Sequence, residues 1–303
     1  MLKTVVDVTI PALVFLLMTV VGLELTAADF RRVARRFRIV ALATAAQVIL
    51  WPLVAVAVLA ALPLKPYLEA GILLVAVCPS GGMANFYTYL GRANLALSVT
   101  LTAVSCLVAV LTTPLLLAIF RSHLDDPATL NAPIPLMIGQ LVLLLILPIL
   151  IGMSARRARP DLARRHGRTL LGVGIVALTA LIALVMVEEW ERLAGDFMEI
   201  SLAVGVLTVI MGLAGWVVGW ACALEARDRF TLAMVLVVRN VGIATAVAVT
   251  VLDRIEFAVF ATAYFLNQVP LLVAALVLFR LTRSSDPAAT KRADHEPDCH
   301  STR

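Results

Sequence analysis

A series of apolar runs, each about twenty residues long, constrains this chain more than any other feature. A helix of this length crosses the ~30 Å hydrocarbon core of a bilayer and satisfies its backbone N–H and C=O groups internally. With 61% hydrophobic and 15% charged residues, the chain is too apolar for an ordinary soluble domain or a disordered one. We therefore predict an all-α polytopic membrane protein. Its nine predicted spans are 4–25, 39–62, 67–91, 93–120, 132–154, 169–188, 197–224, 230–252 and 256–281.

The basic residues predict how these spans are oriented. If the N-terminus lies outside, 19 of the 25 lysine and arginine residues fall in cytoplasmic segments and 5 in external ones, as the positive-inside rule expects. This split supports an odd number of spans in a plasma (inner) membrane, with the C-terminus cytoplasmic. It also explains the net charge of +5 without a nucleic-acid partner. Residues 26–38 are expected to form an interfacial basic helix, and residues 283–303 a disordered cytoplasmic tail.

The third span is interrupted in its middle. The sequence Cys78 to Thr102, CPSGGMANFYTYLGRANLALSVTLT, places Pro79, Ser80, Gly81 and Gly82 at membrane depth. Backbone that leaves the helix there is tolerated only against protein or a water-filled cavity. Such broken helices form the binding sites of many secondary transporters.

A second interruption is predicted in span 8, where Arg239-Asn240-Val241-Gly242 breaks another apolar run. Each broken span is the third of a four-span group, and the two spans run in opposite directions. We therefore expect inverted repeats whose discontinuous helices cross near the middle of the bilayer.

Several polar residues lie deep in the predicted spans, where they are costly and usually functional. Ser98 and Thr102 share one helix face, one turn apart, and with the Asn85 amide would offer neutral oxygen ligands to a monovalent cation. Their hydroxyls could instead bond to preceding carbonyls of their own helix. The other deep polar residues are Gln47, Asn240, Asn267 and Gln268.

Arg239 is permanently charged, and no predicted span carries a carboxylate at mid-depth. Something must compensate a buried guanidinium. The sequence leaves three hypotheses: the arginine neutralises an organic anion, backbone carbonyls hold it as a fixed strut, or it snorkels to a surface. No His, Asp or Glu lies at that depth to provide a nucleophile–base pair or a carboxylate dyad. We therefore predict that the protein is not an enzyme.

These motifs resemble those of the bile acid:sodium symporter superfamily. CPSGGMANFYTYLGRANLALS resembles its first crossing segment, GLELTAADF (Gly22 to Phe30) an upstream motif, and Asn240 to Ala244 its second crossing segment. The resemblance covers roughly residues 10–280. It implies a ten-helix fold, here lacking the first helix, with transport by alternating access. Residues 1–282 would form one transmembrane domain, with core spans in 39–120 and 197–281 and panel spans 4–25, 132–154 and 169–188.

The resemblance also implies ligands. A first sodium site carries over onto Asn85, Ser98 and Thr102, and a second onto Gln47. The family's glutamate shared by both sites becomes Val235, however, and its glutamine becomes Arg239. The local charge changes by about +2, so bound sodium would be repelled. We predict that Arg239 stands in for bound sodium, which would make this chain sodium-independent or coupled to at most one ion.

The sequence thus predicts a secondary transporter of a small or amphipathic organic anion, with no cofactor, with sodium as a candidate coupling ion and with no other metal. Candidate substrate ligands are Gly82, Asn85, Arg239, Asn240, Asn267 and Gln268. The alternatives are a sodium-independent exporter or uniporter and a transporter-like anion sensor. The bilayer and the anion are the expected partners, and no obligate protein partner is inferred.

Overall fold

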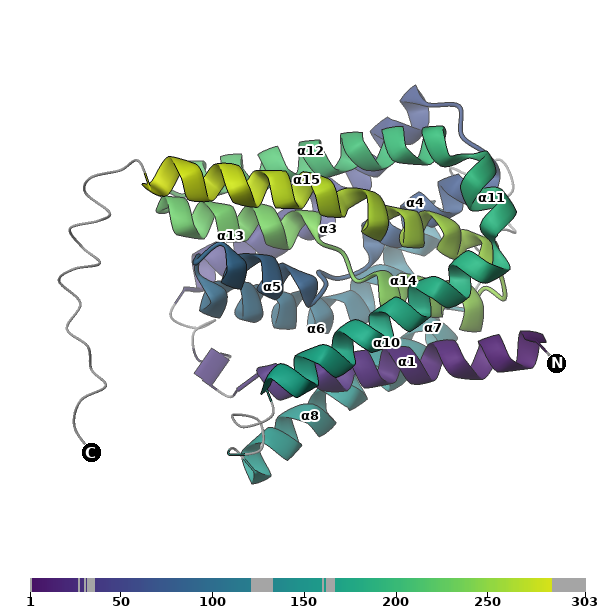
Figure 1. Cartoon of the computed structure of the whole chain (residues 1–303), viewed down its shortest axis with the longest axis horizontal. Coiled ribbons are helices and arrows are strands. Elements are labelled where there is room, and N and C mark those ends of the chain that lie inside the picture. Colours follow the sequence, from purple (N-terminus) through teal and green to yellow (C-terminus); the bar gives the residue numbers. More distant parts are fainter. Residues whose placement is uncertain are drawn as a thin grey trace.

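The computed structural model describes residues 2–26, 28–29, 31, 36–120, 133–159, 161 and 167–284. In this part of the chain the regular structure is helical, apart from one isolated β-bridge. Figure 1 shows long helices stacked roughly along one direction, with α1 beginning at one end of the molecule and α15 ending at the other. The α-helices are α1 (Leu2–Glu24), α3 (Phe37–Ala61), α4 (Pro66–Val77), α5 (Met83–Leu90), α6 (Leu95–Phe120), α7 (Ile134–Leu141), α8 (Leu147–Ala158), α10 (Gly167–Glu188), α11 (Trp190–Gly195), α12 (Phe197–Ala221), α13 (Ala226–Val237), α14 (Val241–Thr250) and α15 (Ala258–Ser284).

The described helices follow the predicted spans closely. Five helical stretches are long and apolar enough to cross a membrane, and four shorter apolar helices accompany them. The third span is divided into α4 and α5, and the eighth into α13 and α14. A π-helical turn, Val142–Ile146, joins α7 to α8. The protein is therefore an all-α integral membrane protein, while the count of nine spans stays a prediction.

The outer surfaces of the long helices are apolar. On α6, Leu107, Leu111, Leu115 and Ile119 follow one another every four residues, and each is about half exposed or more. Residues four apart lie on one face of a helix. A continuous apolar stripe on the outside of the molecule is the surface that lipid chains would contact.

The helices α8 and α10 both pack against α1, and α12 packs against α3, α13 and α15. The contact between α1 and α8 depends on two glycines. A Cβ atom at Gly22 would lie 2.3 Å from the carbonyl oxygen of Ile149, and one at Gly152 would lie 2.3 Å from that of Thr19. Small residues at such points let membrane helices approach closely. The division into a core and a panel that move as separate bodies stays a prediction.

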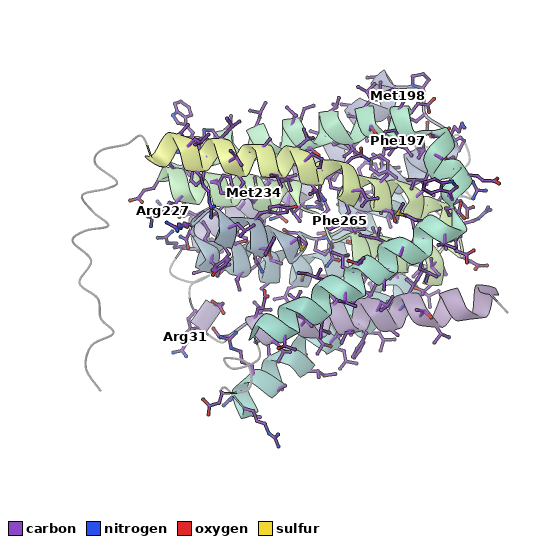
Figure 2. All side chains as sticks on the ribbon, viewed as in Figure 1. Arg31, Phe197, Met198, Arg227, Met234 and Phe265 are labelled. Carbon is purple, nitrogen blue, oxygen red and sulfur yellow. The ribbon has the colours of Figure 1, made fainter. Side chains whose placement is uncertain are left out.

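Charged residues gather at the two ends of the helices. Figure 2 shows Arg31 and Arg227 at the same end of the molecule, and there Arg36 forms an ion pair of 2.8 Å with Asp228. At the opposite end Lys65 pairs with Asp196 at 2.6 Å. The structure thus groups these residues as the charge count did, although which end faces the cytoplasm stays a prediction. The predicted tail lies almost entirely outside the described residues, and so do residues 27, 30 and 32–35 of the basic segment.

Candidate functional site

The two predicted interruptions meet inside the molecule. The helix α4 ends at Val77 and α13 ends at Val237, and the next residues, Cys78 and Val238, are extended. Ser80 and Arg239 then form an antiparallel bridge. The Gly81 N–H donates to the Val238 carbonyl at 3.0 Å, and the Asn240 N–H donates to the Pro79 carbonyl at 2.9 Å. The predicted antiparallel meeting of two broken helices is confirmed.

We call the meeting of residues 78–82 with residues 238–240 the crossing. It requires glycine at position 81. A Cβ atom there would lie 2.6 Å from the carbonyl oxygen of Arg239, too close for any other residue without a shift of the backbone. Ser80 fixes the same crossing from its side chain, because its hydroxyl donates to the Val238 carbonyl at 3.2 Å. The Ser105 hydroxyl of α6 in turn accepts the Ser80 N–H at 3.2 Å.

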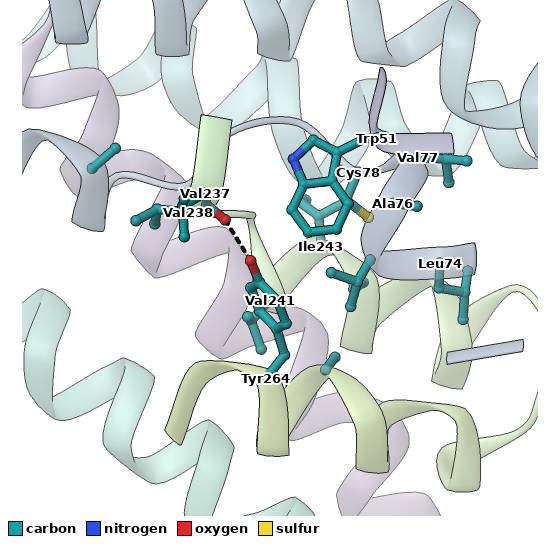
Figure 3. Close-up of a cluster of buried hydrophobic side chains, with 14 of the residues drawn as sticks. Trp51, Leu74, Ala76, Val77, Cys78, Val237, Val238, Val241, Ile243 and Tyr264 are labelled. Atoms are coloured by element: carbon teal, nitrogen blue, oxygen red, sulfur yellow. Dashed lines mark hydrogen bonds between the residues drawn. The ribbon is translucent and has the colours of Figure 1, made fainter. Parts of the chain in front are cut away.

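Each interrupted helix leaves carbonyls without partners in its last turn. For α13 two aromatic side chains supply the donors. The Trp51 indole N–H reaches the Leu236 carbonyl at 2.5 Å, and the Tyr264 hydroxyl reaches the Val237 carbonyl at 2.7 Å. Figure 3 shows the Tyr264 bond beside the Trp51 ring. These aromatic residues therefore complete the hydrogen bonding of the break.

For α4 the main donor is Arg239. Its Nε donates to the Val75 carbonyl at 3.3 Å and its Nη2 to the Ala76 carbonyl at 2.9 Å, while the Thr113 hydroxyl donates to the Val77 carbonyl at 2.7 Å. The guanidinium carbon lies 5.0 Å from the centre of the Trp51 ring. A cation is favourable both at a helix C-terminus and over an aromatic face. Arg239, only 4% exposed, is thus held as the strut hypothesis requires.

A cavity of about 420 Å³ opens beside the crossing. Both crossing segments and the helices α1, α5, α10 and α15 contribute to its wall. Figure 2 shows Phe265, one of its aromatic residues, in the middle of the molecule. Its polar lining comes from Glu24, Asn85, Arg156, Arg239 and Asn240, and its apolar lining includes Leu17, Met18, Val21, Phe86, Ile175, Leu178 and Phe265.

The first turns of α5 and α14 face this cavity. Gly82 and Met83 line it from α5, and Val241 and Gly242 line it from α14. The Asn240 side chain caps α14 by accepting the Ile243 N–H at 3.2 Å. Because the N–H groups of a first helical turn lack partners within the helix, two partly positive helix ends lie at one cavity.

Two of the three residues of the predicted first sodium site, Asn85 and Ser98, are hydrogen-bonded to each other. The Ser98 hydroxyl donates to Asn85 Oδ1 at 2.8 Å. Thr102 is 2% exposed, and its hydroxyl has no hydrogen-bond partner among the described residues. Glu24 adds a carboxylate to this group, because its Oε2 accepts from Asn85 Nδ2 at 3.4 Å. Val235, where the resemblance predicts a carboxylate, is completely buried.

Three of the other predicted residues lie away from the large cavity. Asn267 accepts a hydrogen bond from Ser201 of α12 at 3.0 Å and donates to the Ala263 carbonyl at 3.0 Å. Gln268 is 1% exposed and, like Asn267, does not line the large cavity. Gln47 lines a separate, much smaller cavity that also contacts Arg239. In this conformation neither Asn267 nor Gln268 lines the large cavity, and their role as substrate ligands stays a prediction.

Sequence reasoning missed several residues of the site. Glu24 lies near the end of its predicted span, outside the deep polar group, although it belongs to the GLELTAADF motif. Arg156, whose Nη1 donates to the Leu23 and Glu24 carbonyls at 2.8 and 2.7 Å, follows a predicted span on its cytoplasmic side, where the positive-inside rule alone explains a basic residue. For Trp51 and Tyr264 the sequence held no signal, since an aromatic residue in a span is usually a packing residue.

Comparison with known proteins agrees with the resemblance that the sequence motifs indicate. A family model described as Sodium Bile acid symporter family matches residues 11–196. A relative named "Uncharacterized sodium-dependent transporter YocS", from Bacillus subtilis (strain 168), is 26% identical over 75% of this chain and 69% of its own length. A rice protein (Oryza sativa subsp. japonica) named "Probable sodium/metabolite cotransporter BASS2, chloroplastic" is 30% identical over 66% of this chain and 46% of its own. The rabbit (Oryctolagus cuniculus) "Ileal sodium/bile acid cotransporter" is 29% identical over 45% of this chain and 38% of its own.

Proposed function

Because the chain belongs to the Sodium Bile acid symporter family, whose members are transporters rather than enzymes, we propose that it carries an amphipathic organic anion across the membrane by alternating access, without sodium. The observation that carries this proposal is the cavity of about 420 Å³ beside two crossing helix breaks. Its volume lies in the range of small-molecule binding sites. The proposed membrane is the plasma membrane, with the N-terminus outside.

The cavity wall suits an anion with an apolar body. The N-termini of α5 and α14 offer N–H groups and the positive ends of two helix dipoles, which together bind carboxylate or sulfonate groups. Arg156 adds a full positive charge at the same cavity. The apolar residues of α1 and α10 provide the opposite wall for a hydrocarbon body. Gly82, Asn85 and Asn240 therefore stay in the proposed substrate site.

Arg239 has a different proposed role from the one its charge suggested. Two of its donors already bind the last carbonyls of α4, so the substrate would have to compete for them. We assign it the task of holding the crossing together. Its charge still raises the positive potential of the cavity that it lines, because a buried charge is weakly screened.

Alternating access requires one group of helices to move against another. The helices α1, α8 and α10 form one packed group on one side of the cavity, and α5, α6 and the crossing form the other side. The bond between Glu24 of α1 and Asn85 of α5 spans the two groups. In the proposed cycle this 3.4 Å contact breaks when the cavity changes the side on which it opens.

Sodium independence rests on three residues. At the second predicted site the guanidinium of Arg239 donates to the Val75 and Ala76 carbonyls, which are then not free to bind a cation. Gln47 lines a small cavity that Arg239 also lines. At the first site the buried Val235 supplies no carboxylate, and the Glu24 carboxylate found there is already bonded to the Asn85 amide. The Bacillus relative cited above is named as sodium-dependent and the other two as sodium cotransporters, so sodium independence would distinguish this chain from them.

Uptake by purified protein in proteoliposomes tests the proposal. A labelled conjugated bile acid and a labelled short 2-keto acid serve as probes, in sodium and in potassium buffers of equal ionic strength. We expect uptake of at least one probe at the same rate in both buffers. We also expect faster uptake when the unlabelled probe is present inside, because a carrier shows counterflow whereas an anion sensor does not. Uptake that collapses without sodium would contradict sodium independence.

A matched pair of variants tests the location of the site. Gly174 lines the cavity, and a Cβ atom there would make only an ordinary contact of 3.5 Å with Val20, so Gly174→Leu fills the cavity without a backbone clash. Gly172 lies two residues away on the same helix and has no atom within 4 Å of its Cβ position. We expect Gly174→Leu to abolish uptake and Gly172→Leu to retain it. Equal loss in both variants would place the substrate elsewhere.

A further inference from the structure

A second cavity, of about 10 Å³, lies beside Pro79 and Arg239 of the crossing. Its lining comes from α3, from the end of α4, from α6 and from Arg239. A cavity of this volume holds one water molecule or one ion of similar size. It shares Arg239 with the large cavity but is otherwise lined by different residues.

Hydrogen-bond donors without partners gather at this small cavity. Among the residues that the structure describes, the Thr44 hydroxyl, the Gln47 amide and Arg239 Nη1 all lack a hydrogen-bond partner, and all three residues line the cavity. Gln47 is 3% exposed and Arg239 is 4% exposed. Buried polar groups are almost always paired, so unpaired ones around a cavity point to a missing ligand.

The charge of Arg239 indicates the sign of that ligand. Within the described part of the chain no carboxylate forms an ion pair with it. Its compensation consists of two carbonyls at the end of α4 and the face of Trp51. A helix C-terminus carries only about half a negative charge, and a ring face carries none. A buried unit charge thus remains partly uncompensated, which is costly in a low-dielectric interior.

Guanidinium, amide and hydroxyl N–H and O–H groups that converge on one small space are suited to an acceptor with a negative charge. A sodium ion would find the Gln47 amide oxygen and the Thr44 hydroxyl oxygen there, but beside a permanent positive charge that repels it. A carboxylate-sized ligand exceeds the space. We propose that this cavity binds a single chloride ion, which serves as the counter-ion of Arg239 and stabilises the crossing of the two broken helices.

Thermal unfolding of the purified full-length protein tests the proposal without any substrate. The protein is heated in potassium chloride and in potassium gluconate of equal ionic strength, so that sodium is absent and only the anion differs. We expect a higher melting temperature in chloride, rising with concentration and saturating, because a ligand that binds only the folded state stabilises it. Radioactive chloride should also be retained by the protein. Equal melting temperatures and no retained label would show that the cavity holds water only and would overturn the proposal.

Two variants locate the effect. In Gln47→Glu the side chain keeps its size and supplies the negative charge itself, so we expect the difference between chloride and gluconate to disappear. If that variant fails to fold, Thr44→Val decides: it removes one donor to the ion and should weaken chloride binding about tenfold. Thr262→Val is the matched control, because Thr262 is a buried hydroxyl without a described partner that does not line this cavity. Chloride stabilisation that is unchanged in both cavity variants would place the ion elsewhere and contradict the proposal.

This experiment is independent of the transport assay. A protein that carries no anion could still bind chloride beside Arg239, and a carrier could work with water in the cavity. The two proposals can therefore fail separately.

Discussion

If the wild-type protein is sodium-independent, as proposed above, the double substitution Val235→Glu with Arg239→Gln should create sodium binding. The change removes the guanidinium that occupies the Val75 and Ala76 carbonyls at 3.3 and 2.9 Å. It also places a carboxylate on the buried face of α13, where Val235 has no exposed surface. Two carbonyl oxygens, one carboxylate and the Gln47 amide then become available to a cation.

The size of the effect follows from the distances. A cation that shares those carbonyls with Arg239 would lie about 4 to 5 Å from its charge, and at an effective dielectric of about 20 the repulsion is roughly 3 to 4 kcal/mol. Because 1.4 kcal/mol corresponds to a factor of ten, removal of the guanidinium alone should strengthen sodium binding by roughly 100- to 1,000-fold. The new carboxylate adds to this gain, at the cost of its own burial.

The assay is thermal unfolding in sodium chloride and in potassium chloride of equal concentration, which keeps the anion constant. We expect equal melting temperatures for the wild-type protein and a sodium-specific increase for the double variant. The single variant Val235→Glu is the control, because its carboxylate should pair with Arg239 and gain little from sodium. A sodium-specific increase in the wild-type protein, as large as in the double variant, would refute the argument that Arg239 excludes sodium.

Three further predictions concern stability. Tyr264→Phe leaves a buried carbonyl of α13 without its donor and should cost about 1 to 3 kcal/mol in unfolding free energy, measured by chemical denaturation in detergent, whereas Tyr89→Phe at an exposed position should change it little. Gly81→Ala should lower both stability and transport, because its Cβ would lie 2.6 Å from a backbone oxygen of the crossing, whereas Gly139→Ala meets no atom within 4 Å; equal effects would contradict the assigned geometry. Burial raises the pKa of Asp196, but hydrogen bonds from a lysine and a tyrosine more than offset this and hold the pKa below its usual value. Its stabilising contribution is therefore present above about pH 4 and is lost as the pH falls through the lowered pKa, so the melting temperatures of the wild-type protein and Asp196→Asn should converge in acid.

Much of the fold could be predicted because the bilayer imposes it. Apolar runs must become helices in hydrocarbon, and the described helices begin and end within a few residues of the predicted spans. The breaks at Ser80 and Arg239 could also be predicted. Pro-Ser-Gly-Gly and Arg-Asn-Val-Gly interrupt apolar runs with residues that are costly at membrane depth or that favour the end of a helix. Their opposite directions followed from counting spans.

The partners of the breaks could not be predicted. Which donors reach the last carbonyls of α4 and α13 depends on how helices distant in the sequence pack together. Trp51 and Tyr264 reach across 185 and 27 residues respectively. The orientation of Gln268 could not be predicted either. Its depth in span 9 made it a candidate substrate ligand, but depth does not say which side of a helix faces the cavity, and Gln268 does not line it.

The sequence by itself determined that the chain crosses a membrane in helices and that two of these helices are broken. Every backbone polar group in hydrocarbon needs a hydrogen-bond partner, and the local residue order decides where a helix can provide that partner. Only the tertiary structure decided what Arg239 does. Its charge required compensation from some source, but the choice among substrate, carbonyl and surface depends on distances between α4, α3 and the crossing, which no local pattern contains.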